Sequence, residues 1–394
     1  MLLAILAVAL VGGFVLTFVL FYAVLFLLAL SYLWVHLNAR PLDIRAEGLA
    51  EKYEVGGLVD ERITVQNHGK LPRLSVVVSE KSDLPGHSNR RVITVPGRKS
   101  RTWRNATPCQ MRGYFTLGPF EVTSEDPFGV FRRTRTCGTP EHVLVYPASI
   151  ELPGFQLFPL TEQGQRRNPQ ATHRITPNAA WVRDYSPGDS LSRIHWRSTA
   201  RTAKLMVKEF DLDLSDEVWI ALDLHRGANA GAGKESAIEY AITAVASLAR
   251  KYLEAGTRLG LVGYGDRPYR IPADNGPKHL RRIMESLALA KAEGNRTMAQ
   301  VLVRERELLS TRTHLVVVTC QADPELNATL HRSARSGKAT VILVDRSSFE
   351  DGARPPSSPE AELSDAAGNI YVVRKGDNLA EALSKTRHAP AARP

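Results

Sequence analysis

The 394-residue chain has little cysteine and, in residues 1–39, no Asp, Glu, Lys or Arg. Its three cysteines, Cys109, Cys137 and Cys320, form no CxxC pair and no even set. This argues against a disulfide-stapled secreted module and a cysteine-rich zinc domain. The chain also lacks a GxSxG elbow and a GxxxxGK[ST] loop, so neither nucleophile chemistry of the hydrolase type nor a nucleotide site is indicated. A hydrophobic content of 43% argues against a largely disordered chain.

The uncharged start of the chain is apolar almost without interruption from Leu2 to Val35. At 1.5 Å per residue it would form roughly 51 Å of helix, whereas a bilayer core of about 30 Å needs about 20 residues. We therefore predict a transmembrane anchor in residues 1–39. It can be one span after a break at Gly12-Gly13, or a tight hairpin.

A cleaved signal peptide is the competing interpretation of this segment. Such a peptide has a basic start and an apolar run of about 7–15 residues, and the segment has neither. Arg40, Arg45 and Lys52 follow the apolar run directly. By the positive-inside rule they predict a chain held at the cell membrane, with its soluble part in the cytoplasm.

Residues 40–148 contain short β-rich runs with alternating apolar residues, separated by Gly, Pro and Asn. They predict an antiparallel β-sandwich. A run of basic residues without an acidic one lies within it: Arg90, Arg91, Arg98, Lys99, Arg101 and Arg104. Two interpretations stay open, protection of a strand edge and contact with anionic lipid headgroups. Nucleic acid is not expected, because no nucleic-acid-binding signature accompanies the charge.

From residue 216 to 387 apolar strands alternate with helices. Strands are expected at 217–225, in "TRLGLVGYG", "THLVVVTC", "KATVILVD" and "NIYVVRKG", with "PYRIP" as a short edge strand. One helix is expected to end at Gly256, and two more are expected at about 277–292 and at 297–310. Buried strands separated by helices predict a doubly wound, Rossmann-like parallel sheet. Residues 388–394 are expected to be a disordered tail.

Residues 149–215, between the two predicted domains, contain the dense motif "WVRDYSPGDSLSRIHWRSTARTAKLMVKEF" at 181–210. Its Pro-Gly-Asp sequence predicts a turn, a short helix follows, and the end of the motif returns as a strand. Its candidate functional residues are Arg183, Asp184, Tyr185, Pro187, Gly188, Asp189, His195, Trp196, Arg201 and Glu209. They form either a packed linker with an ion-pair network, or a surface that docks a partner or an anionic ligand.

This motif, together with "RGYFTLGP" and "DPFGVF" before it, resembles the signature of the domain-of-unknown-function 58 family of bacteria. The resemblance covers essentially the whole chain. It implies membrane helices, a β-rich segment and a von Willebrand A-like α/β domain. It also implies association with MoxR-like AAA+ ATPases, often with a transglutaminase-like membrane protein. From the residues themselves we expect no cofactor.

Von Willebrand A-like domains often bind Mg²⁺ through Asp-x-Ser-x-Ser after the first strand, with a Thr and an Asp from later loops. The corresponding stretch here is Asp223-Leu224-His225-Arg226-Gly227, in which both serines are replaced. Asp223, Thr297 and Asp323 are the remnants of such a site. Because Mg²⁺ requires nearly complete oxygen coordination, we expect no metal site here.

The sequence as a whole favours a non-catalytic, membrane-anchored cytoplasmic adaptor. It would dock a MoxR-like ATPase for the maturation or remodelling of an envelope or membrane client. Two alternatives stay open. One is an envelope-associated enzyme or anionic-ligand-binding protein that uses His195, Asp189 and Arg201. The other is a Mg²⁺-dependent adhesion-type domain.

Overall fold

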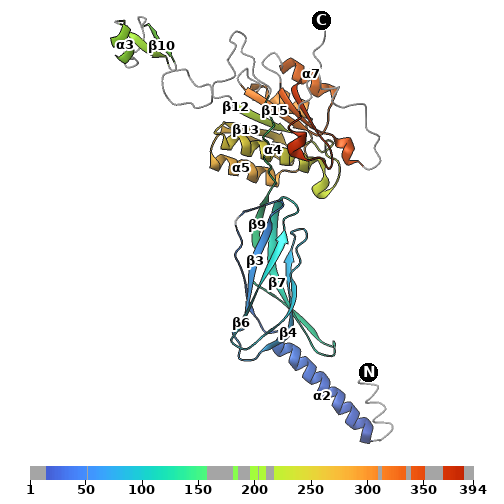
Figure 1. Ribbon diagram of the computed structural model, residues 1–394. Coiled ribbons are helices and arrows are strands. Elements are labelled where there is room, and N and C mark those ends of the chain that lie inside the picture. The colour runs from blue at the N-terminus through green and yellow to red at the C-terminus, as the bar shows by residue number, and fades with distance from the viewer. Residues whose placement is uncertain are drawn as a thin grey trace. The chain divides into compact units, whose positions relative to one another are not determined.

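The computed structural model describes residues 15–50, 52–157, 181–184, 196–202, 204–209, 217–308, 313–333, 339–350 and 367–385 (Figure 1). The chain divides into two units, one formed mainly by residues 1–149 and the other mainly by residues 150–394. We call residues 40–149 of the first, which follow its N-terminal helix, the β unit, and we call the second the α/β unit.

Helix α2, Val15–Asn38, is the long apolar helix with which the described part of the chain begins. Its 24 residues span about 36 Å, so it is long and apolar enough to cross a membrane. Most large side chains along it are exposed, whereas Ser31, Val35 and Asn38 near its end are buried. The predicted apolar helix is therefore confirmed. A hairpin partner would lie in residues 1–14, outside the described residues.

The β unit consists of two sheets (Figure 1). One has the order β1-β3-β6 and is antiparallel. The other has the order β2-β9-β7-β4-β5, with β8 paired to β7, and within it the β2–β9 pair is parallel. The strands are β1 Asp43–Glu47, β2 Lys52–Glu54, β3 Leu58–Gln66, β4 Arg73–Ser82, β5 Arg90–Val95, β6 Ser100–Pro108, β7 Gly113–Glu125, β8 Arg132–Cys137 and β9 Glu141–Tyr146.

Alternation of buried and exposed residues gives each sheet one apolar face. Strand β3 buries Val59, Glu61, Ile63 and Val65 on one face. The residues that alternate with them are more exposed. Ile63 and Val65 join Val78 from the second sheet in one apolar cluster. The two sheets therefore share a core.

The α/β unit contains one six-stranded sheet with the order β14-β13-β12-β15-β16-β17. Every neighbouring pair is parallel except β13–β14. The elements are β12 Glu217–Leu222, α4 Ala237–Glu254, β13 Leu259–Tyr264, β14 Pro268–Asp274, α5 Pro277–Leu289, α6 Met298–Arg304, β15 Thr313–Thr319, α7 Pro324–Ser333, β16 Ala339–Val344, β17 Ala367–Val373 and α8 Leu379–Ala382.

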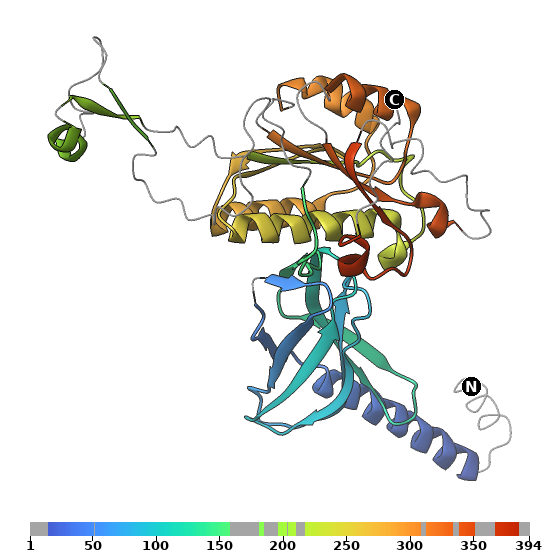
Figure 2. The same ribbon diagram turned by 45° about the horizontal axis from the view of Figure 1, so that its top comes forward.

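The central strands are buried because helices cover both faces of the sheet (Figure 2). All residues of β16 are buried, as expected of a strand enclosed on both sides. Helices α6 and α7 contribute Leu302 and Leu330 to a cluster with Trp219 and Val317 of the sheet. Strand β14 is the predicted short edge strand and pairs antiparallel with β13.

Helices α5 and α6 are shorter than the sequence predicts. Helix α5 ends at Leu289 rather than near residue 292, and α6 ends at Arg304, followed by a separate 3-10 turn at Arg306–Leu308. The loop between them contacts the end of the sheet, where Gly294 forms an isolated parallel β-bridge with His225. That contact lies outside the local sequence and could not be predicted from helical periodicity.

Gly260 on β13 provides space for the indole of Trp219 on the neighbouring strand β12. A Cβ atom at position 260 would lie 2.6 Å from the Trp219 ring. We predict that Gly260→Ala lowers the free energy of unfolding by about 1–3 kcal/mol, because overpacking forces the indole out of position. Thermal unfolding of the detergent-solubilised chain measures this. An unchanged midpoint would show that the ring can move without cost.

Candidate functional site

In open α/β sheets ligands bind beyond the carboxyl ends of the strands, where the strand order reverses. Here that point lies between β12 and β15, because the chain continues from β12 to β13 on one side and from β15 to β16 on the other. Asp223 follows β12 directly, and Thr319 ends β15. This edge of the sheet is the candidate site of the α/β unit.

Asp223 is buried and fixed by two hydrogen bonds. The Thr319 hydroxyl donates to its Oδ2 at 2.7 Å, and the His225 backbone N–H donates to its Oδ1 at 3.0 Å. Burial raises the pKa of the Asp223 carboxyl, and this effect exceeds the lowering by the two hydrogen bonds. The carboxyl therefore ties the end of β12 to the end of β15.

The other two predicted remnants of a metal site are helix caps. The Thr297 hydroxyl accepts a hydrogen bond from the Gln300 N–H at 3.4 Å, and the Gln300 side chain accepts one from the Thr297 N–H, a capping box at the start of α6. Asp323 Oδ1 accepts from the Leu326 N–H at 2.6 Å at the start of α7. Asp323 is also near enough to Asp223 to raise its pKa. Thr297 and Asp323 thus each cap the start of a helix, a role that the sequence analysis did not predict.

Two arginines hold the loop that replaces the predicted serines. Arg226 bonds through its guanidinium to the Asn295 side chain, and Arg346 bonds to the Gly227 carbonyl. The Gly294 N–H donates to the Leu224 carbonyl at 2.9 Å, and a Cβ atom at position 294 would collide with backbone. The loop is therefore fixed by backbone contacts and by two positive side chains.

A pocket of about 240 Å³ lies at the carboxyl ends of β15 and β16. Asp345 in its wall accepts hydrogen bonds from Ser347 and pairs with Arg374 at 3.3 Å. Burial raises the pKa of the Cys320 thiol, which keeps the sulfur protonated and poorly nucleophilic. The lining residues are Cys320, Gln321, Ala322, Leu343, Asp345, Arg346, Ser347 and Glu350.

The signature motif is described in part. Strand β10, Trp181–Asp184, pairs antiparallel with β11, Met206–Glu209, so the backbone of Arg183 lies opposite Val207. Helix α3, Trp196–Thr202, lies between them in the chain and carries the exposed Arg201. Five predicted residues lie outside the described residues: Tyr185, Pro187, Gly188, Asp189 and His195.

The basic run of the β unit spreads along two edge strands. All six side chains are exposed: Arg90, Arg91, Arg98, Lys99, Arg101 and Arg104. Arg91 stacks on the Trp103 ring at 5.8 Å. Arg98 and Lys99 lie in the turn between β5 and β6, where the Arg98 N–H donates to the Gly69 carbonyl at 2.9 Å. The turn therefore lies beside the loop that precedes β4, and the other four side chains lie farther along the strands.

The end of α2 is bonded to the β unit through Asn38, next to the start of β4 (Figure 1). Asn38 Nδ2 donates to the Leu74 carbonyl at 2.7 Å and to Ser124 Oγ at 2.9 Å, while Oδ1 accepts from the Leu74 N–H at 2.8 Å. The buried Arg73 donates to the Leu37 carbonyl at 2.8 Å, which satisfies an orphan carbonyl of the helix end. We call these contacts the helix clamp.

The loop between β7 and β8 extends the helix clamp. Asp126 accepts hydrogen bonds from the Phe131 N–H at 2.6 Å and the Phe128 N–H at 3.0 Å, and also from Ser31 of α2. Desolvation acts to raise the pKa of Asp126, but these hydrogen bonds outweigh it and lower the pKa. The Tyr32 ring of α2 contacts the Phe131 ring edge-on at 5.7 Å.

The sequence profile described as "Protein of unknown function DUF58" matches residues 181–377. The chain belongs to this family. The predicted resemblance is therefore confirmed.

Two relatives extend the family match. The Uncharacterized protein YeaD of Bacillus subtilis is 24% identical over 354 residues, which cover 86% of this chain and 84% of YeaD. The Uncharacterized protein Rv1480 of Mycobacterium tuberculosis is 30% identical over 105 residues, 26% of this chain and 33% of that protein. The likeness to YeaD thus includes both units of this DUF58 chain.

Among solved structures, the CARDB domain of PF1109 from Pyrococcus furiosus matches with 13% identity and a TM-score of 0.21, covering 26% of this chain and 93% of that domain. At that TM-score the match carries no inference about fold or function.

Sequence reasoning missed one polar cluster of the β unit, formed by Glu61, Glu80 and His87. A signal was present. Glu61 has the same phase as the buried Val59 and Ile63 on β3, and Glu80 has the phase of the buried Val78 on β4. A glutamate on the apolar face of an alternating strand marks a buried carboxylate.

We predict that Thr297→Ala lowers the free energy of unfolding of this DUF58 chain by about 1 kcal/mol, because α6 loses its N-cap. Thr297→Asn keeps a capping oxygen and should retain most of that stability. Thermal unfolding of both variants in Mg²⁺ and in EDTA separates a cap from a metal ligand. A loss seen in Mg²⁺ alone would contradict the capping role.

Proposed function

We propose that the chain is a non-catalytic, membrane-anchored adaptor. In this proposal α2 crosses the membrane, the β unit sits on the cytoplasmic membrane surface, and the α/β unit docks a MoxR-like AAA+ ATPase that acts on an envelope or membrane client. The helix clamp is the observation that carries the proposal.

The helix clamp supports anchoring because it buries the end of α2 in the β unit. A flexible tether needs no such contacts, whereas Asn38 alone makes three hydrogen bonds to residues of β4 and β7. Val35 and Ser31 are buried one and two turns before Asn38. A cleaved signal peptide would leave these partners without α2. An uncleaved helix that holds the β unit at one place on the membrane suits an adaptor.

The loops beside the helix clamp form a surface suited to a bilayer. Phe128 is 61% exposed, Val130 55% and Leu71 51%. Arg98 and Lys99 lie in the neighbouring turn. Exposed apolar side chains next to basic ones favour the headgroup region of an anionic membrane, where each basic residue contributes about 1 kcal/mol. Arg40 and Arg45 directly after α2 favour the cytoplasmic side.

The α/β unit supports a docking role on two grounds. Its strand order, with β14 antiparallel at one edge, suits a von Willebrand A-like domain. Its sheet end holds a buried protonated thiol, helix caps and arginine-fixed backbone rather than an exposed nucleophile with a base. The ATPase itself is proposed from the family resemblance, and the signature motif with its exposed Arg201 is the proposed docking surface.

Affinity isolation of the full-length chain from gently solubilised membranes, with mass spectrometry of the bound proteins, tests the proposal. We predict recovery of a MoxR-like ATPase in the presence of ATP and at least a tenfold lower recovery with Arg201→Glu. Arg90→Glu, an exposed charge reversal on β5, is the matched control and should leave recovery unchanged. Absence of any AAA+ ATPase, or equal loss with both variants, would contradict the proposed docking surface.

We predict that Asn38→Ala opens the helix clamp, because the partly buried N–H and carbonyl of Leu74 lose their Asn38 partners. Hydrogen exchange of the Leu74 amide in nanodiscs should become at least tenfold faster. Asn275→Ala, at an exposed asparagine of the α/β unit, should leave that exchange unchanged. Unchanged exchange in Asn38→Ala would show that Asn38 does not hold the helix.

A further inference from the structure

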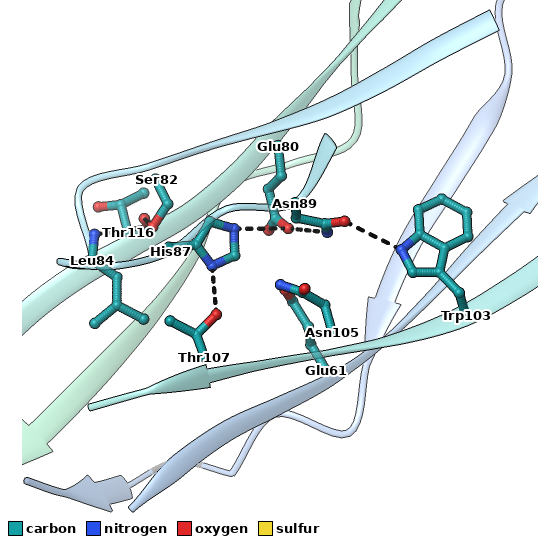
Figure 3. Close-up of polar contacts among 10 residues, drawn as sticks. All are labelled: Glu61, Glu80, Ser82, Leu84, His87, Asn89, Trp103, Asn105, Thr107 and Thr116. Carbon is teal, nitrogen blue, oxygen red and sulfur yellow. Dashed lines mark hydrogen bonds and ion pairs between the residues drawn. The ribbon is translucent and has the colours of Figure 1, made fainter. Parts of the chain in front are cut away.

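Three buried side chains from separate parts of the β unit meet at one point (Figure 3). Glu61 comes from β3 in one sheet, Glu80 from β4 in the other, and His87 from the turn between β4 and β5. One oxygen or nitrogen atom of each lies within 4.8 Å of the other two. The side chains of Glu80 and His87 are 1% and 2% exposed, and Glu61 is 1% exposed.

A hydrogen bond holds each of the three side chains in place (Figure 3). Asn105 Nδ2 donates to Glu61 Oε1 at 2.9 Å, and Asn89 Nδ2 donates to Glu80 Oε2 at 2.7 Å. The Thr107 hydroxyl lies 3.0 Å from His87 Nδ1. Such outer partners orient metal ligands in proteins, since they fix the carboxylate position and the imidazole tautomer.

One polar atom of each of these three side chains has no such partner. Glu61 Oε2, Glu80 Oε1 and His87 Nε2 are buried and make no hydrogen bond within the described part of the chain. His87 Nε2 lies 3.3 Å from Glu80 Oε2, an ion-pair distance without hydrogen-bond alignment. A buried polar atom without a partner costs about 1–3 kcal/mol, more if charged. Three such atoms, on side chains whose ligand atoms lie within 4.8 Å of one another, indicate an occupant that accepts lone pairs.

The electrostatics of the cluster favour a cation. Two carboxylates in one dry site repel each other unless protons or a cation intervene.

We propose that Glu61, Glu80 and His87 bind one divalent transition-metal ion, zinc by preference, as a structural site that joins the two sheets of the β unit. Imidazole and carboxylate together suit zinc, whereas Mg²⁺ and Ca²⁺ prefer oxygen ligands only. Glu61 Oε2, Glu80 Oε1 and His87 Nε2 are the ligand atoms. This proposal does not depend on the adaptor function.

The local geometry suits such an ion. Ligands at about 2.0–2.2 Å from tetrahedral zinc lie roughly 3.3–3.5 Å apart, so side-chain shifts of about 1 Å close the site. With zinc on Nε2, the His87 Nδ1–H donates to Thr107, which the present contact allows. Gly86 and Ser88 beside His87 are exposed, so the turn that carries the histidine provides an entry path.

Zinc titration of the tag-free, full-length chain in detergent, after EDTA and dialysis, tests the proposal. We predict one equivalent of Zn²⁺ per chain by calorimetry and elemental analysis, a higher midpoint of thermal unfolding, and visible Co²⁺ absorption bands of a low-coordinate site. His87→Asn should lose the equivalent and the bands. His68→Asn, at an exposed histidine of the same unit, should keep both.

Two further variants keep the test decisive if His87→Asn does not fold. Glu61→Gln removes a buried charge without changing shape, so the metal-free variant should fold at least as stably as the unaltered chain and yet gain no stability from Zn²⁺. Asn105→Ala should weaken Zn²⁺ binding by about 10–100-fold, because Glu61 loses its orienting partner. No bound equivalent of Zn²⁺ or Co²⁺, or equal binding in Glu61→Gln, would overturn the proposal and leave a proton-sharing network.

Discussion

The side-chain amide of Asn38 is the contact on which the account of this protein depends. It both donates to and accepts from the backbone of Leu74, as a neighbouring strand would, and it adds a bond to Ser124. These hydrogen bonds attach the last turn of the apolar helix to strands β4 and β7. Because Arg73 satisfies the Leu37 carbonyl at the same place, little freedom is left between helix and sheet. Where α2 lies in a bilayer, the loops around the helix clamp must lie at its surface.

The carboxyl ends of the strands in the α/β unit carry structural contacts. Asp223, placed where a metal ligand is expected, joins two strands through Thr319. Thr297 and Asp323 begin helices, and Arg346 fixes the neighbouring loop. Each of these four side chains thus has a structural partner.

The parts of this fold that depend on local pattern could be predicted from sequence. The uncharged run predicted the apolar helix, and the continuous apolar strands predicted the parallel sheet with a short edge strand, which the structure has at Pro268–Asp274. Contacts between distant segments could not be predicted. One such contact is the bridge of Gly294 to His225, which lies in the loop after the early end of α5. The caps formed by Thr297 and Asp323 are local, each joining residues three apart, but the sequence analysis considered these two residues only as remnants of a metal site. The cluster around Glu61 shows an intermediate case, in which strand phase marks burial but only the fold shows the partners.

The most direct test of the account is the distance distribution between α2 and the β unit in nanodiscs. Spin labels at cysteines introduced at Leu27 on α2 and Leu58 on β3, both exposed, measure it by electron–electron resonance in a Cys137→Ser background. The account predicts one narrow distribution, which broadens when Asn38→Ala is added. A broad distribution in the chain with its native Asn38 would contradict a clamped helix, and with it the proposal that this protein holds its domains at a fixed place on the membrane.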